Sequence, residues 1–419
     1  MRFFDGSRIA IVLAVLLLIA LFQAVPLGAQ EFGTAGGRVE PAHRAAWVVS
    51  PVFPDRWQVA TAAVELPGSD GYLVAGQRDD NDPSQIAAWV MKLDRHGRTH
   101  WWRNFDEARE VRGLGLAALP DGGAFLAGSV GDGLRARPWI ARISTDARVF
   151  WERSLPAPSD VWSGIEALIP SAAGDLLAAG TDYFPDGKTK TWLLRLTAEG
   201  EVLQRWEVPS PTPRGVHRLI ELPDRSLALS GPLLAAAESS IAERRRRDAW
   251  VARLSSEGEV IWRADLAGGP QEEIGGLAPD GPSGLLVAGW QLDAPWHATQ
   301  AWTRRFASNG RAIGELTFGG RDMDLLAAVL PGPSGGHWLI GSTHPGPHRE
   351  AAQPATAWKR SLDAGGVLGE AQILGTAARM DLATALRSRD GGLLTVGWRT
   401  IRRQLLPDIW VARFVLPTG

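Results

Sequence analysis

The sequence predicts an all-β fold: a seven-bladed β-propeller of four-stranded antiparallel blades. The first observation is a set of seven tryptophans at intervals of 50 to 58 residues: Trp89, Trp139, Trp192, Trp250, Trp302, Trp358 and Trp410. The second is that each tryptophan follows the same local order of a turn, an apolar run ending in glycine, and a variable loop. Self-similarity at this period is typical of repeat architectures, and it predicts one closed ring rather than several domains.

Each repeat is expected to contain four short strands, and the second repeat shows them most clearly. Residues 111–119 form its first strand, and residues 120–123 (Pro-Asp-Gly-Gly) form a turn in which glycine tolerates positive φ angles. Residues 124–128, 139–143 and 149–155 supply the other three strands. Because the second and third strands are apolar on both faces, each sheet needs cover on both sides, which radial stacking of blades provides.

The N-terminal part of the domain is expected to close the ring. The seventh repeat has first, second and third strands but no fourth strand before Gly419. Residues 44–51 (RAAWVVSP) match the tryptophan-bearing fourth strands of other repeats, such as VFWERSL and VIWRADL. We therefore predict that Trp47 lies on an outer strand beside the C-terminal strand, and that the propeller spans residues 44–419.

Residues 1–30 are predicted to be a signal peptide or an N-terminal membrane anchor. Basic residues outweigh acidic ones ahead of Ile9–Phe22, an unbroken apolar run of 14 residues. A spanning helix needs about 20 residues, so this length favours a signal peptide, and Ala29 offers a small residue for cleavage. Residues 31–43 form a leader segment, and the body is expected to be periplasmic or secreted, or held at the inner membrane if the segment is not cleaved.

Composition excludes several kinds of site. The chain has no cysteine, which excludes disulfides, thiol nucleophiles and cysteine-ligated metals. A net charge of −2 gives no indication of a nucleic acid, and the membrane would be contacted only through an uncleaved N-terminal segment. No serine-hydrolase, metalloprotease or phosphate-loop motif is present. We therefore predict no catalytic residue, no cofactor and no metal site.

An acidic residue recurs at the start of the first strand in six repeats. These residues are Asp55, Glu110, Asp160, Glu273, Asp324 and Asp381. In a propeller they lie near the axis, where a ring of carboxylates could bind a cation or a basic ligand. Repetition in nearly every blade favours a structural role instead, in which each acid caps a turn or pairs with the next blade.

A basic residue recurs three positions after the tryptophan of the third strand. These residues are Lys92, Arg142, Arg195, Arg253, Arg305 and Arg413. A cation in a buried sheet needs a partner, which the recurrent acid or a tryptophan ring would supply. We predict a structural lattice of ion pairs between blades.

The loops between second and third strands vary most, and they carry the candidate ligand-binding residues. These residues are Arg244, Arg245, Arg246, Arg247, Trp296, His297, His344 and His348. The arginine run could bind a phosphate, a sulfated glycan or an acidic protein, although charge runs are usually only solvated. Trp296 could stack on a sugar ring. His344 and His348 have a metal-like spacing, but no third ligand is evident.

The repeat resembles those of exported bacterial β-propeller proteins, with a consensus near GG…DD…DGGYIVAG…DVWLVKLD..G…W. The resemblance is carried by residues 317–322 (TFGGRD), 248–254 (DAWVARL) and 390–392 (DGG), and it covers about residues 44–415. It implies the propeller fold, and it implies structural or adhesive modules rather than one activity.

The leading functional prediction is a non-enzymatic platform that binds an envelope protein or a glycan. The alternative is an extracytoplasmic carbohydrate-active hydrolase or lyase on the same scaffold. Paired carboxylates about 5–10 Å apart in one pocket would favour the enzyme. Axial acids that each contact a neighbouring blade would favour the platform.

Overall fold

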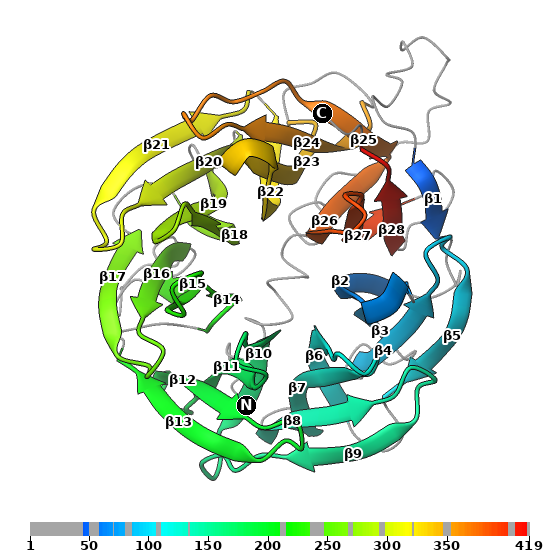
Figure 1. Ribbon diagram of the computed structural model, residues 1–419, viewed down its shortest axis with the longest axis vertical. Coiled ribbons are helices and arrows are strands. Elements are labelled where there is room, and N and C mark those ends of the chain that lie inside the picture. The colour runs from blue at the N-terminus through cyan, green and yellow to red at the C-terminus, as the bar shows by residue number, and fades with distance from the viewer. Residues whose placement is uncertain are drawn as a thin grey trace, which may run out of the picture.

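The chain folds into a ring of antiparallel sheets, as Figure 1 shows for a computed structural model. The structure describes residues 45–49, 58–69, 71–79, 86–105, 110–132, 135–209, 215–234, 247–266, 271–292, 298–320, 322–346, 353–400 and 407–416. The predicted signal or anchor (1–30) and leader (31–43) lie outside these residues. Within the described part of the chain, no helix is long and apolar enough to cross a membrane.

Five sheets have four strands each, and in four of them the strands pair in chain order. The first comprises β2 (Gln58–Glu65), β3 (Tyr72–Asp79), β4 (Ile86–Leu93) and β5 (Thr99–Asn104). The second comprises β6 (Glu110–Ala118), β7 (Ala124–Asp132), β8 (Arg135–Ile143) and β9 (Val149–Ser154). The third comprises β10 (Trp162–Pro170), β11 (Leu176–Tyr183), β12 (Thr189–Leu196) and β13 (Val202–Val208). The fourth comprises β14 (Arg218–Glu221), β15 (Leu227–Leu234), β16 (Arg247–Leu254) and β17 (Val260–Leu266).

The fifth four-stranded sheet joins the two ends of the described chain. It has the order β1-β28-β27-β26. Its strands are β1 (Ala45–Val49), β26 (Arg379–Arg387), β27 (Leu393–Thr400) and β28 (Asp408–Phe414). Trp47 lies opposite Arg413 on antiparallel strands, so the prediction that Trp47 sits beside the C-terminal strand is confirmed.

The prediction of seven separate blades is wrong, because the structure has five separate four-stranded blades and one eight-stranded sheet. The wide sheet contains β18 (Glu272–Asp280), β19 (Gly284–Leu292), β20 (Thr299–Phe306), β21 (Ala312–Phe318), β22 (Met323–Pro331), β23 (His337–His344), β24 (Ala355–Leu362) and β25 (Gln372–Ala377). Two four-strand meanders are joined in it by one parallel pairing, between Thr299 of β20 and Met323 of β22. The Thr299 hydroxyl also donates to the carbonyl of Asp324 at 3.0 Å, which fastens the junction.

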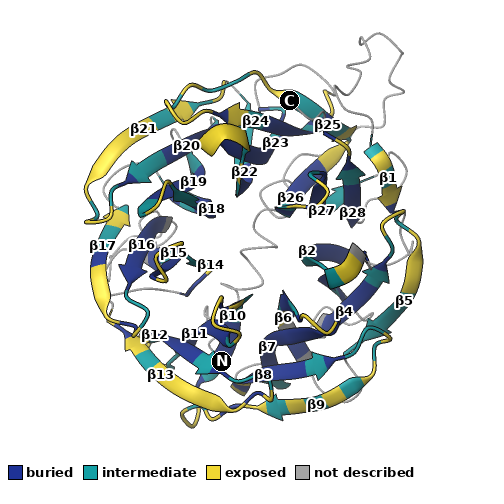
Figure 2. Ribbon diagram, viewed as in Figure 1, coloured by how far each residue is buried: buried dark blue, intermediate teal, exposed yellow. Residues whose placement is uncertain are grey.

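Each sheet runs from the centre of the ring to its rim. Figure 1 shows β2, β6, β10, β14, β18, β22 and β26 nearest the centre and β1, β5, β9, β13, β17 and β21 at the rim. Burial follows the same order, and the rim strands carry most of the exposed residues in Figure 2. Two short 3₁₀ turns, η2 (Pro67–Ser69) and η4 (Pro333–Gly335), lie between first and second strands.

The register explains why each apolar run ends in glycine. In every repeat this glycine lies directly opposite the tryptophan of the third strand: Gly76–Trp89, Gly128–Trp139, Gly180–Trp192, Gly231–Trp250, Gly289–Trp302, Gly341–Trp358 and Gly397–Trp410. A Cβ atom at Gly76 would lie 2.4 Å from Trp89 Cζ2, so a side chain there would collide with the ring. The seven tryptophans are at most 4% exposed and belong to core clusters shared by neighbouring repeats.

A second set of tryptophans, on the fourth strands, locks each blade to the next. Trp47, Trp101 and Trp262 each donate their indole N–H to a carbonyl in the following blade's hairpin turn, at 2.8, 2.8 and 3.0 Å. Trp151 and Trp206 lie against the glycines of the corresponding turns, Gly200 and Gly258. The blades are therefore held together at the rim as well as through their cores.

Candidate functional site

Of the six recurrent acids, the structure describes the side chains of four, because Asp55 lies outside the described residues and only the backbone of Glu110 is described, at the start of β6. Asp160 is exposed and forms an ion pair at 2.8 Å with Arg135 of the preceding blade. Glu273 lies close enough to Arg218 of the preceding blade to raise the pKa of that guanidinium, which burial lowers more strongly. Asp381 Oδ1 contacts His344 Nε2 at 2.5 Å and accepts the Ser342 hydroxyl, both from β23.

Asp324 is bound within its own repeat. Its carboxylate accepts the Thr343 hydroxyl at 2.5 Å and the Gly320 amide at 3.2 Å. Burial raises the pKa of this carboxyl above its ordinary value, because these hydrogen bonds only partly offset the loss of water. All four described acids therefore interact with protein groups; Asp160 and Asp381 contact a neighbouring repeat, and Glu273 interacts electrostatically with one.

The predicted loop-face residues are mostly beyond the described part of the chain. Arg244, Arg245, Arg246, Trp296, His297 and His348 lie outside it, and only the backbone of Arg247 is described, at the start of β16. His344 is described, but it is 4% exposed and bonded to Asp381. Its burial at the end of β23 removes His344 from a solvent-facing loop surface.

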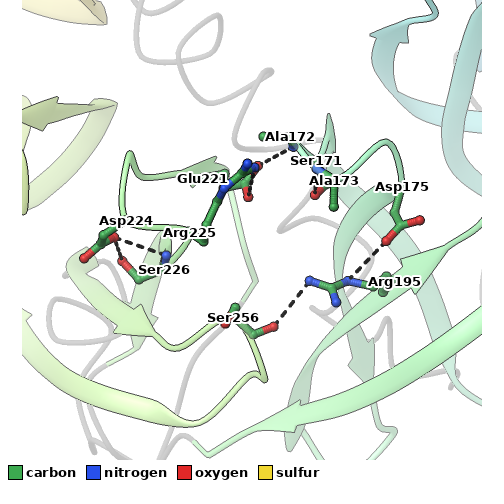
Figure 3. Close-up of polar contacts among 10 residues, drawn as sticks. All are labelled: Ser171, Ala172, Ala173, Asp175, Arg195, Glu221, Asp224, Arg225, Ser226 and Ser256. Atoms are coloured by element: carbon green, nitrogen blue, oxygen red, sulfur yellow. Dashed lines mark hydrogen bonds and ion pairs between the residues drawn. The ribbon is translucent and has the colours of Figure 1, made fainter.

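The recurrent basic residues pair with different acids from those expected. Each arginine binds an acid in the turn between the first and second strands of its own repeat, or at the end of the first strand: Arg142–Asp121, Arg195–Asp175, Arg253–Asp224, Arg305–Asp280 and Arg413–Asp390. The link to the next repeat runs instead to backbone, since Arg195 also donates to the carbonyl of Ser256 (Figure 3). The predicted lattice therefore consists of ion pairs within blades and arginine–carbonyl bonds between them.

Arg253 is the most deeply buried arginine of this lattice, and we expect its replacement to destabilise the protein clearly. Its side chain is 3% exposed, and besides Asp224 it donates to the Ser226 hydroxyl and to the Ser308 carbonyl. We expect Arg253→Met to lower the free energy of unfolding by about 2 kcal/mol, since it removes the hydrogen bonds of a buried guanidinium and leaves the buried Ser226 hydroxyl without this donor. Arg142→Met is the matched control. The Arg142 side chain is 24% exposed, so we expect a loss of about 1 kcal/mol in chemical denaturation.

The seam between the β10–β13 and β14–β17 blades carries two carboxylates. At one end of the seam, Glu221 Oε2 accepts the Ala172 amide of the neighbouring blade at 2.6 Å, and Glu221 Oε1 pairs with Arg225 at 3.4 Å (Figure 3). Further along the seam, Glu166 Oε2 accepts the Val216 amide at 2.8 Å. These two contacts fix β14 against β10 along its length.

Glu166 has an unusual environment that sequence reasoning missed. The register of β10 shifts between Ile165 and Ala167, which leaves Glu166 at a β-bulge. Its Oε2 accepts the Thr181 hydroxyl at 2.8 Å, and its Oε1 accepts the Tyr183 hydroxyl at 3.1 Å. Burial raises the pKa of this carboxyl to about 7, and the three hydrogen bonds oppose that rise without cancelling it.

The innermost strand beside this seam, β14, is short. β14 has 4 residues, whereas the other innermost strands have 8 or 9. A shallow hollow beside β14 is lined by His217, Gly231, Pro232, Ala249, Glu272, Glu273 and Ile274. It has room for about one water molecule and is too small for a sugar or a peptide. The described residues include no group of three side chains that could hold a metal ion.

Comparison with known proteins supports the fold only. No known family model and no curated protein matches the chain. Similar solved structures include a protein of unknown function from Dyadobacter fermentans DSM 18053, with 12% identity, a TM-score of 0.51, and coverage of 90% of this chain and 100% of that one. The β-propeller domain of the Trilobed protease from Pyrococcus furiosus has 12% identity and a TM-score of 0.44, covering 85% and 95%. Trypanosoma rangeli sialidase has 10% identity and a TM-score of 0.46, covering 86% and 55%.

Proposed function

We propose that the protein is an extracytoplasmic, non-enzymatic β-propeller that binds an envelope protein or a glycan through its variable loops. The observation that carries this proposal is the contrast between the two ends of the blades. Segments between second and third strands range from residues 133–134 to residues 235–246. The turns between third and fourth strands are all five residues long in the first five repeats: 94–98, 144–148, 197–201, 255–259 and 307–311. One end is a uniform scaffold, and the variable end suits recognition.

The state of the axial acids agrees with a binding role. A glycosidase needs two carboxyl groups free to face one substrate. Asp160 and Asp381 instead contact groups of the neighbouring repeat, and Glu273 interacts electrostatically with Arg218 of the preceding one. The proposed contact residues are Arg244–Arg247, Trp296, His297 and His348, which come from the long loops of three successive repeats.

A sulfated-glycan probe tests the arginine run. We expect that changing Arg244, Arg245, Arg246 and Arg247 to serine lowers the salt concentration that elutes the protein from heparin, because each lost cation removes an electrostatic contact. The matched control changes four exposed arginines at the uniform end, namely Arg95, Arg98, Arg148 and Arg311. Equal elution shifts for the two quadruple variants would show that net charge alone binds heparin. The arginine run would then no longer be a proposed contact surface.

One observation favours the alternative of a carbohydrate-active hydrolase or lyase. A carboxyl with a pKa of about 7, such as that of Glu166, is about half protonated at neutral pH and suits a general acid. The alternative predicts release of reducing sugar from envelope polysaccharide by the wild-type protein and not by Glu166→Gln. Heparin retention without any sugar release by the wild type would leave the binding platform as the function.

A further inference from the structure

Glu166 differs from the residues at the same bulge in four other innermost strands. In β2, β18, β22 and β26 the register also shifts by one residue, and the extra residue is small: Thr61, Gly275, Ala327 and Ala383. A bulge therefore needs no carboxyl group for its geometry. In β10 the same position places the Glu166 carboxyl group against the segment that leads into β14 of the next blade.

That segment is short, and Glu166 is one of its few anchors. Gly215 lies against the carboxyl group with φ +139°, and a Cβ atom there would be 3.1 Å from both carboxylate oxygens and 2.7 Å from Tyr183 Oη. Val216 donates to Glu166, and the His217 amide donates to the Ser230 carbonyl at 2.8 Å. Residues 215–217 are thus held by one hydrogen bond to Glu166 of β10, one backbone hydrogen bond to β15 and the burial of Val216, rather than by a full ladder.

No cation balances Glu166 among the described residues. Tyr183 of β11 faces it, while Asp182 of the same strand binds Ser163, Trp192 and Arg205. On the segment before β14, His217 is exposed. From the start of β14, Arg218 donates to the carbonyls of Gly275 and His217.

Two described arginines of the preceding blade, which packs beside β10, are engaged elsewhere. In the preceding blade, Arg135 pairs with Asp160 and Arg142 pairs with Asp121. Among the described residues, the partly buried carboxylate of Glu166 is therefore held by three hydrogen bonds and no ion pair, so its ionised form bears a cost of lost hydration.

The site can hold the carboxyl group in either charge state. Oε2 faces the Val216 amide, which can only donate, and the Thr181 hydroxyl. Oε1 faces the Tyr183 hydroxyl, which can donate or accept. A proton on Oε1 is therefore donated to Tyr183 Oη while Oε2 keeps the bond to Val216. Protonation rotates one hydroxyl and leaves the contact between the blades intact.

We propose that Glu166 is a proton-operated latch between the β10–β13 and β14–β17 blades. The neutral carboxyl group keeps residues 215–217 closed against β10, and its ionisation favours an open seam in which water reaches the carboxylate. The sign follows from linkage: the closed seam holds a carboxyl of pKa about 7, while a hydrated one titrates near 4.5. The closed form is therefore favoured at low pH and loses that advantage as pH rises from about 4.5 to about 7.

Hydrogen–deuterium exchange of residues 215–221 in the full chain tests the latch. Glu166→Gln mimics the neutral state, because its amide oxygen can accept the Val216 amide while its NH₂ group donates to Tyr183. We expect the ratio of wild-type to Glu166→Gln exchange rates to rise by about 30-fold between pH 5.5 and 8.5. This factor is the part of the pH-dependent change in the opening equilibrium that falls above pH 5.5. A ratio that does not change with pH overturns the proposal.

Two comparisons keep the test specific. Glu221→Gln removes the other carboxylate of the same seam, and a pH-dependent ratio as large as that of Glu166→Gln would overturn the assignment to Glu166. The wild-type protein alone provides a second measurement, in which exchange at 215–221 is corrected for intrinsic rates and compared with 284–292 of β19. A rise at 215–221 alone is expected, and an equal rise in both peptides would contradict a local latch.

Discussion

Deleting Ala45–Val49 is expected to unfold the ring or to lower its free energy of unfolding by at least about 3 kcal/mol. These residues form β1, the fourth strand of the last blade. Val49 is 6% exposed in the core shared with β2–β5, and Trp47 lies over Gly97 of the first blade with its indole N–H bonded to the Arg95 carbonyl. Loss of a fully buried tryptophan costs about 3–5 kcal/mol, and although Trp47 is only partly buried, the deletion also removes buried Val49 and exposes the edge of β28.

Urea denaturation measures the effect, and Val48→Ser is the control. Val48 lies in the same strand but is 37% exposed. We expect that substitution to change the free energy of unfolding by no more than about 0.5 kcal/mol. A deletion variant as stable as the wild type would show that β1 does not close the ring.

The propeller was readable from the sequence because its strongest pattern has one physical cause. A glycine facing a tryptophan across two strands must recur wherever the large ring is buried, so the Gly–Trp order marks register as well as repeat. Trp47 was identifiable for a similar reason, since a tryptophan at the rim of each of several blades contacts the next hairpin turn. Local sequence and packing agree at these positions.

The number of separate sheets was not readable, because it depends on one backbone contact. The pairing of Thr299 with Met323 joins two meanders, and neither residue differs in type from what a separate blade would accept. The partners of the basic residues were also misassigned. The turn acids Asp121 and Asp224 are nearer to Arg142 and Arg253 than the axial acids are, which only the register reveals.

Glu166 was missed because a bulge moves it out of the alternation on which strand prediction rests. Aligning the innermost strands would have shown a glutamate where Thr61, Gly275, Ala327 and Ala383 stand. The importance of Glu166 depends on the short strand β14. In the sequence, that short strand is visible only as a repeat that departs from the consensus. The most informative position of the seam thus lies where the repeat pattern weakens.

Gly200→Ala is expected to lower the free energy of unfolding by about 3 kcal/mol, because the new methyl group must displace a rim tryptophan. Gly200 ends the turn between β12 and β13 with φ +78°, and a Cβ atom there would lie 2.2 Å from Trp151 Cη2 of the preceding blade. A left-handed conformation costs alanine about 1 kcal/mol, and forcing apart a packed contact adds about 1–3 kcal/mol.

Gly187→Ala separates these two costs. Gly187 closes a similar five-residue turn with φ +84°, but a Cβ atom there meets nothing within 4 Å. We therefore expect Gly187→Ala to cost only about 1 kcal/mol in the same denaturation experiment. If the two alanine variants were equally stable, Trp151 would not press on this turn.

A double variant assigns the extra cost to the contact between blades. In Trp151→Ala the ring is already absent, so adding Gly200→Ala should cost no more than Gly187→Ala does in the wild type. The coupling energy between the two positions is then about 2 kcal/mol, and it measures how tightly one blade grips the next. If the effects of the two substitutions on the free energy of unfolding were additive, the rim contact would not contribute to the stability of the ring, and the inner cores alone would hold the blades together. Strong coupling means that the rim tryptophans and turn glycines transmit strain from blade to blade.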